Sequence, residues 1–316
     1  MQDIKEIEIF STDFQGKNLA IEGNHVFYCN DIVKEVILLS KNNNSVDEIT
    51  NEINNKYLTN YKPTNIEESL LLIDKYKEKK KITFPHIDLF FPRGRLFPKI
   101  DFTTKHKTFI IIALMFFVNL IYVINADFPA IHTVREKTLI FFLLIIILLG
   151  HELGHAFFAR QYNIITGKIG IGLYFLIFPV LYITINQIWR LKKGKRIVIN
   201  CGGIIFQTII GVLLIICNLF YNNEIISSLI KANFIVICLN LNPLIKFDGY
   251  WILSDFWDDR ELYDNSKLVI KNWLKLKFKS NMKNKVLIYS FLRLLFILFV
   301  LYYFIKFFIN IILWLA

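Results

Sequence analysis

Long apolar runs separated by short basic segments occupy most of this chain. Five runs are long enough for a membrane-spanning helix and contain few charged residues, at about 108–126, 138–160, 197–221, 225–245 and 286–316. About 20 apolar residues of helix cross the hydrocarbon core of a bilayer. The pattern therefore predicts five transmembrane helices.

The segment at 169–188 is also apolar, but Gly170, Gly172 and Pro179 interrupt it. Its apolar residues partly alternate around 181–185. A further span is one interpretation, and a re-entrant loop or hairpin fits the helix-breaking residues better. We therefore predict a polytopic α-helical membrane protein with about five to six spans, including a possible re-entrant hairpin.

Residues 1–82 have the mixed pattern of a small soluble domain. Stretches at 7–14 and 18–29 alternate weakly and predict short strands, and helices are predicted to follow. The second and third helices each begin at a capping box, where Ser or Thr precedes Glu by three residues, at Ser45–Glu48 and Thr64–Glu67. We divide the chain into a small α+β cytosolic domain (1–82), an interfacial linker (83–107) and a membrane-embedded domain (108–316).

Charge and composition agree with a membrane protein. Hydrophobic residues make up 54% of the 316 residues, and the net charge is +11. The bases gather at the ends of apolar runs, so contact with anionic lipid of the bilayer explains the excess better than binding to nucleic acid. The four cysteines show no paired spacing, which predicts small buried residues and not disulfides or metal ligands.

The positive charges also predict an orientation. Five bases at 190–196 and seven lysines at 267–285 belong on the cytoplasmic side, whereas the loops at 127–137 and 222–224 carry few bases. Residues 1–22 lack the apolar core of a signal peptide. We expect a multi-pass protein of the cell membrane with a cytoplasmic N-terminus.

Candidate chemistry lies in the second run, where Gly150-His151-Glu152-Leu153-Gly154-His155 follows a stretch without charge. On a helix, His151 and His155 lie one turn apart on one face, so both imidazoles can bind one Zn²⁺. Glu152 is placed beside them to accept a proton from water. Three ionisable residues at membrane depth in this spacing are hard to explain as a chance pattern.

A catalytic zinc site needs a third protein ligand. Asp248 is the candidate, because the predicted orientation brings it to the depth of the histidines at the end of the fourth run. Pro243 breaks that helix, and Asn240 and Asn242 are costly in a membrane unless they face a wet cavity. A solvent-exposed aspartate at the membrane edge is the competing interpretation.

These motifs together resemble the site-2 protease family of intramembrane zinc metalloproteases. The resemblance covers about residues 105–300 and rests on HELGH, on Asn240-x-x-Pro243 and on Asp248-Gly249. It implies that His151, His155 and Asp248 bind zinc, that Glu152 is catalytic, and that Asn240 helps to hold the reacting carbonyl group.

Within that family, the form Asn-Pro-Leu-x-x-x-Asp-Gly-Tyr and the stretch at 170–172 are similar to bacterial peptide zinc metalloproteases of ribosomal-peptide maturation. Two positions depart from the family pattern. Tyr250 replaces the second glycine of the commoner Asp-Gly-Gly form, and Gly202–Phe206 lacks the usual Gly-Pro-x-x-Asn. The second departure leaves the role of that helix open.

The order of strands and helices at about 5–80 is similar to a PqqD-like peptide-recognition domain. That resemblance implies a winged-helix-like fold in residues 1–82, which would bind the leader of a precursor peptide by adding it as a strand to a sheet edge. A general cytosolic regulatory domain is the alternative.

The function predicted from these features is an intramembrane zinc endopeptidase that hydrolyses a small peptide or peptide precursor near the cytoplasmic face. One alternative is regulated intramembrane proteolysis of a signalling protein. Another is a peptide exporter or immunity protein of the same fold without hydrolysis, which has no need for a glutamate beside zinc ligands. A DNA-binding regulator ranks last, because residues 1–60 carry no strong basic stripe. The oligomeric state stays open.

Overall fold

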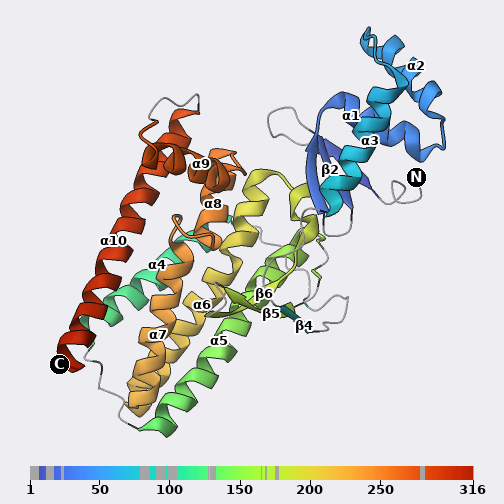
Figure 1. Cartoon of the computed structure of the whole chain (residues 1–316). Coiled ribbons are helices and arrows are strands. Elements are labelled where there is room, and N and C mark those ends of the chain that lie inside the picture. The colour runs from blue at the N-terminus through green and yellow to red at the C-terminus, as the bar shows by residue number, and fades with distance from the viewer. Residues whose placement is uncertain are drawn as a thin grey trace. The chain divides into compact units, whose positions relative to one another are not determined.

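The computed structural model describes residues 7–11, 18–22, 25–78, 86–89, 97, 105–126, 128, 133–164, 166–167, 169–174, 178–277 and 282–315. The chain forms two compact units, which are coloured along the chain in Figure 1. The sheet unit comprises residues 1–99 and 159–192, and the helical unit comprises 100–158 and 193–316. Most of the predicted linker at 83–107 lies outside the described residues.

The sheet unit begins with an antiparallel meander of β1 (Glu8–Ser11), β2 (Asn18–Glu22) and β3 (His25–Cys29). Helices α1 (Asp31–Lys41), α2 (Val46–Tyr57) and α3 (Pro63–Glu78) follow. Apolar residues from these strands and helices share one core, which includes Ile7, Ala20, Cys29, Ile37, Ile53 and Ile66. The predicted order of strands followed by helices is confirmed, and the winged-helix arrangement stays a prediction.

The starts of these helices follow from local hydrogen bonding. The capping box of α2 is confirmed, because Glu48 N donates to Ser45 Oγ and Ser45 N donates to a Glu48 carboxylate oxygen. The capping box predicted at Thr64 is wrong, because α3 begins at Pro63 and the Asn65 side chain accepts a hydrogen bond from the backbone N–H of Lys62. Proline suits the first helical position, since the N–H that it lacks would have no partner there.

A second antiparallel sheet contains β4 (His86–Leu89), β5 (Ile169–Tyr174) and β6 (Phe178–Ile183), in that order. A short 3-10 helix, η2 (Asn186–Arg190), follows β6. The apolar segment at 169–188 is therefore a hairpin in the structure and not a membrane-spanning helix. Its re-entrant placement stays a prediction.

The helical unit consists of α4 (Lys105–Asn125), most of α5 (Val134–Gln161), α6 (Lys193–Tyr221), α7 (Glu224–Leu241), α8 (Asp248–Trp257), α9 (Leu262–Leu274) and α10 (Asn284–Leu315). In the part of the chain that the structure describes, four helices (α5, α6, α7 and α10) are long and apolar enough to cross a membrane. A shorter apolar helix lies at Phe109–Asn125. These helices support a membrane protein, and the number of spans stays a prediction.

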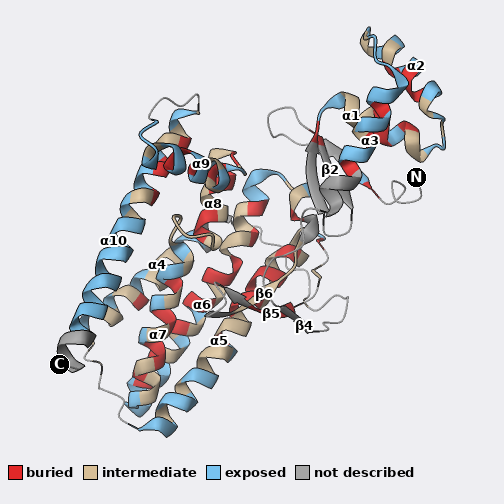
Figure 2. Cartoon of the chain, viewed as in Figure 1, coloured by how far each residue is buried: buried red, intermediate tan, exposed pale blue. Residues whose placement is uncertain are grey.

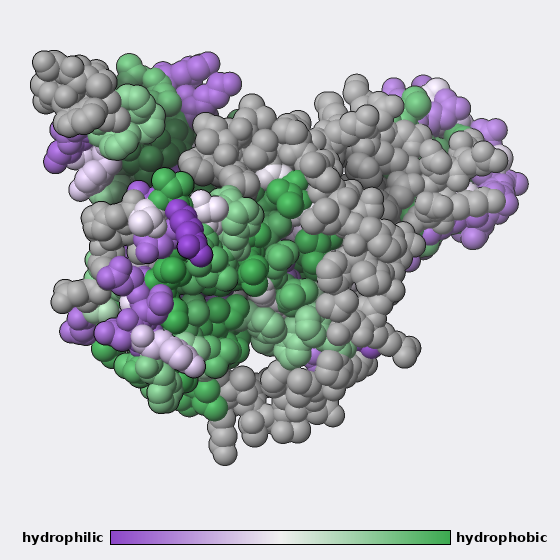
Figure 3. Space-filling view, turned by 90° about the horizontal axis from the view of Figure 1, so that it is seen from below, coloured by the Kyte–Doolittle hydropathy of each residue, from purple (hydrophilic) through white to green (hydrophobic). Residues whose placement is uncertain are grey.

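Burial differs strongly among these helices. Helix α6 contacts α4, α7 and α8, and its buried residues appear in red in Figure 2. In contrast, only 6% of the apolar window of α10 is buried. Figure 3 shows hydrophobic side chains over much of the visible face of the helical unit. A helix that is apolar all round and yet exposed is typical of contact with lipid.

Uncharged polar side chains join α4, α6 and α7 inside this apolar bundle. Asn119 donates to Thr208 O over 3.1 Å, and Asn233 donates to Gln207 O over 3.0 Å. Gly211 leaves the space for them, because a Cβ there would collide with Asn119 Oδ1. Hydrogen bonds between helices are favoured where water is excluded, since an amide without a partner is costly in hydrocarbon.

Candidate metal centre

His151, Glu152 and His155 lie on α5 with exposed fractions of only 5%, 9% and 7%. The spacing of one helical turn places the two imidazoles side by side, with ring centroids 4.8 Å apart. Their Nε2 atoms are 3.1 Å apart. The local structure of α5 therefore directs two nitrogen atoms toward one point.

Asp248 joins this pair from another helix. Helix α7 ends at Leu241, the chain turns through Pro243, and α8 begins at Asp248. One carboxylate oxygen, Oδ2, lies 3.1 Å from His151 Nε2 and 3.3 Å from His155 Nε2. The side chain is 18% exposed, so the competing interpretation of a solvent-exposed aspartate is wrong.

The outer nitrogen of each imidazole faces a hydrogen-bond acceptor. His151 Nδ1 lies 2.8 Å from Gln207 Oε1, and His155 Nδ1 lies 2.8 Å from Ile199 O. Because these oxygens only accept, the neutral imidazole would carry its proton on Nδ1 and direct the lone pair of Nε2 at Asp248. Three electron-pair donors thus face one another at close range.

Such a donor set fits a cation. His151, His155 and Asp248 form a group with metal-ligand spacing among the described residues. Asp248 Oδ2 is buried, and no hydrogen-bond donor reaches it within the described part of the chain. Two imidazoles and one carboxylate match the three protein ligands of a catalytic zinc site, which keeps its fourth position open.

Two glycines bring α6 against α5 at the level of the histidines. A Cβ on Gly202 would lie 2.6 Å from Gly154 O, so the two backbones are in contact. A Cβ on Gly203 would collide with the His151 ring. The small residues Gly202 and Gly203 therefore permit the close approach of the two helices.

Gln207 is a site residue that the sequence analysis missed. Its side chain is fully buried on α6, and its Oε1 contacts His151 Nδ1 over 2.8 Å. It directly follows the Gly202–Phe206 stretch that departs from the family pattern. An uncharged polar residue in the middle of an apolar run was the available signal.

Replacing Gln207 with leucine should weaken zinc binding by about 10-fold to 100-fold, because the partner that fixes the His151 ring and its tautomer is lost. The measurement is competition for zinc against a fluorescent chelator. Thr208→Val is the matched control, since the Thr208 hydroxyl on the same helix bonds only to Ile204 O among the described residues. Equal affinities for the two variants would contradict this role of Gln207.

Asn240 lies at the end of α7, on the Gln207 side of the cluster. Its Nδ2 is 3.4 Å from Gln207 Oε1 and 3.5 Å from His151 Nδ1. Both distances are at the long limit for a hydrogen bond. The side chain therefore adjoins the cluster, and its part in holding a carbonyl group stays a prediction.

The helix that carries Asp248 is anchored by a buried ion pair. Arg196 Nε donates to Asp255 Oδ1 over 2.6 Å, and Asn200 donates to the other carboxylate oxygen over 3.1 Å. Arg196 belongs to α6 and is buried, although it lies at the end of a basic segment of the sequence. The pair fixes the start of α6 against α8.

Tyr250 provides a second anchor for α8. It is fully buried, and its hydroxyl donates to Arg260 O and accepts from Tyr263 N. Burial raises the pKa of Tyr250 to about 12, so the hydroxyl stays protonated at neutral pH. The residue that departs from the Asp-Gly-Gly form thus joins the Asp248 helix to the start of α9.

Comparison with known proteins bears on this site. The chain is similar to "Putative peptide zinc metalloprotease protein YydH" of Bacillus subtilis (strain 168), with 26% identity over 168 residues. The match covers 52% of this chain and 66% of that relative, so the chain spans just under two thirds of the relative's length. No protein-family profile and no solved structure matches. The similarity supports a peptide-processing zinc metalloprotease at the level of the family alone.

Proposed function

We propose that the chain is an intramembrane zinc endopeptidase that hydrolyses a small peptide or peptide precursor. The observation that carries the proposal is the meeting of His151, His155 and Asp248, with Glu152 next to the first histidine. The similarity to YydH supports the same reaction class.

In the proposed reaction, His151, His155 and Asp248 would hold Zn²⁺, and the bound ion would supply a Lewis acid for water and for the peptide carbonyl. Glu152 accepts the proton of the attacking water and passes it to the leaving nitrogen. Gln207 and Ile199 O hold the two imidazoles in one tautomer. Asn240 donates from Nδ2 to the carbonyl oxygen as negative charge develops there.

We propose further that the centre lies toward the cytoplasmic side. Lys192, Lys193 and Lys195 are exposed at the start of α6. Ile199, whose carbonyl contacts His155, follows Lys193 by only six residues, or about 9 Å of helix. At the other end of α6, the turn at 222–223 carries no base. The positive-inside tendency therefore favours a cytoplasmic position for the basic end of α6. We propose the same side for the N-terminus of the chain.

We propose a substrate-binding role for the N-terminal strands and helices. In the described part of this meander, β1 and β3 are the outer strands and β2 lies between them. An outer strand offers backbone groups to which an extended leader peptide can pair. This mode of binding suits a peptide precursor better than the transmembrane helix of a signalling protein.

The proposed function is tested on the full-length protein purified in detergent. We expect about one zinc ion per chain by elemental analysis, as the three-ligand site requires. Cleavage of candidate precursor peptides, followed by mass spectrometry, should stop with 1,10-phenanthroline and return when Zn²⁺ is added. A chain that binds no zinc would overturn the proposal. Bound zinc without cleavage of any precursor peptide would favour an exporter or immunity protein.

A further inference from the structure

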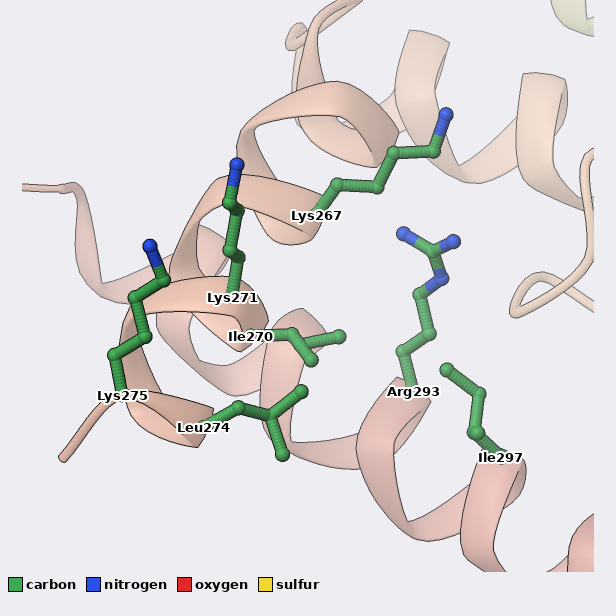
Figure 4. Close-up of a pocket in the computed structure, with 7 residues that line it drawn as sticks. All are labelled: Lys267, Ile270, Lys271, Leu274, Lys275, Arg293 and Ile297. Atoms are coloured by element: carbon green, nitrogen blue, oxygen red, sulfur yellow. The ribbon is translucent and has the colours of Figure 1, made fainter.

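A hollow of about 400 Å³ lies between α9 and α10 in the helical unit, and its lining includes none of the residues of the metal centre (Figure 4). Four of its lining residues are cations, namely Lys267, Lys271, Lys275 and Arg293. The other three are Ile270, Leu274 and Ile297. The surface of the hollow is mostly apolar, the four cationic side chains lie around it, and no acidic residue lines it among those that the structure describes.

The lysines recur at every fourth position, which places them along one side of α9 and its C-terminal end. Figure 4 shows the amines of Lys271 and Lys275 pointing to the same side, away from the Leu274 side chain. Both are exposed, and neither has an ion-pair partner among the residues that the structure describes. Lys267 has an exposed contact of 3.4 Å with Asp264, which leaves most of its charge available.

Arg293 supplies a fixed charge at the edge of the hollow. Its guanidinium donates to Ser266 Oγ over 2.7 Å and to Tyr263 O over 3.1 Å, and lies 3.6 Å from the centre of the Tyr263 ring. A hydroxyl, a carbonyl and an aromatic ring orient the cation without neutralising it. The side chain is therefore held in place with its charge intact.

The hollow also lies in the first half of α10, near the cytoplasmic-side bases that the sequence predicts. Lys283 precedes the helix and Lys285 lies in its first turn. After Arg293, Lys306 is the only charged residue in the sequence. Ile297 follows Arg293 by one helical turn and is 37% exposed. Arg293 and Ile297 thus lie on the part of α10 that is near its basic end, where anionic headgroups of a bilayer are expected.

We propose that this hollow binds an anionic phospholipid. The phosphate pairs with Lys271, Lys275 and Arg293, and the first part of an acyl chain lies along Leu274 and Ile297. Charge complementarity favours a phosphate, while the apolar floor that runs onto the exposed face of α10 favours a lipid over a soluble anion. The proposal requires only a membrane protein and is independent of peptidase activity.

Native mass spectrometry of the full-length protein in detergent tests this site with phosphatidylglycerol as the probe. The double variant Lys271→Gln, Lys275→Gln should bind phosphatidylglycerol about 25-fold more weakly, or about fivefold for each lysine removed. Lys277→Gln, Lys283→Gln is the matched control, because it removes the same charge from exposed lysines outside the hollow. It should bind like the unaltered protein.

Equal loss in the two double variants would overturn the proposal in favour of general surface charge. Equal binding of phosphatidylcholine by the unaltered protein would overturn it in favour of apolar contact alone. Displacement of phosphatidylglycerol by millimolar inorganic phosphate would indicate a site for a soluble anion. An unchanged melting temperature shows that a variant is folded. If either double variant is unfolded, the single variants Lys271→Gln and Lys277→Gln are compared in place of the two double variants.

Discussion

Glu152→Gln is expected to lower the rate of peptide cleavage by at least about 100-fold, while zinc content and folding stay unchanged. Glutamine keeps the size of the side chain and one acceptor oxygen but cannot accept the proton of the attacking water. Because Glu152 is not one of the three residues whose ligand atoms converge, the metal should stay bound. The variant therefore separates the proton-transfer role from metal binding.

The measurement pairs cleavage of a precursor peptide with elemental analysis of the same preparation. Glu224→Gln is a suitable control, because Glu224 is exposed in the first turn of α7 and the change in charge is the same. The control should keep full activity. Wild-type cleavage by Glu152→Gln would show that this carboxylate is not the base.

Asp248→Asn should weaken zinc binding by more than about 100-fold, beyond the loss expected for a residue that only supports a ligand. The amide has nearly the same shape but carries no negative charge, so the two imidazoles would be left to hold the metal. Cleavage should fall with zinc occupancy and recover only in part at high zinc concentration. Competition with a chelator measures the zinc affinity. Cleavage measured over a range of zinc concentrations shows how far activity recovers.

Asp258→Asn provides the control for this change. Asp258 ends the same helix with φ of 55°, a conformation that asparagine also accepts. This variant should bind zinc like the unaltered protein. If Asp248→Asn also kept the original affinity, the third ligand would have to be another residue.

Much of the architecture could be predicted because it depends on local patterns. Apolar runs mark the long helices, and the HELGH spacing alone places His151 and His155 on one face of α5. Residues that interrupt a helix also act locally. The glycines and Pro179 at 169–188 therefore correctly favoured a hairpin. The Thr64 error concerns one turn, where Pro63 determines the first helical residue.

The parts that could not be predicted depend on which helix faces which. Gln207 and Ile199 O meet the imidazoles only because Gly154 and Gly202 let α5 and α6 touch. Arg196 sits within a basic sequence, and nothing local shows that its partner Asp255 follows much later in the chain. Such pairings come from packing in three dimensions, which hydrophobic periodicity does not describe.

The separate anchoring of Asp248 has a thermodynamic consequence. Two ligands belong to α5, whereas the third is carried by α8, which packs through Tyr250 against Leu262, Val286 and Tyr289 of α9 and α10. A bound metal ion would thus act as a cross-link between two parts of the bundle. Its binding free energy would add to the stability of their association, and loosening of α8 would in turn lower metal affinity. Melting temperature and zinc occupancy should therefore change together, even for substitutions far from the ligands.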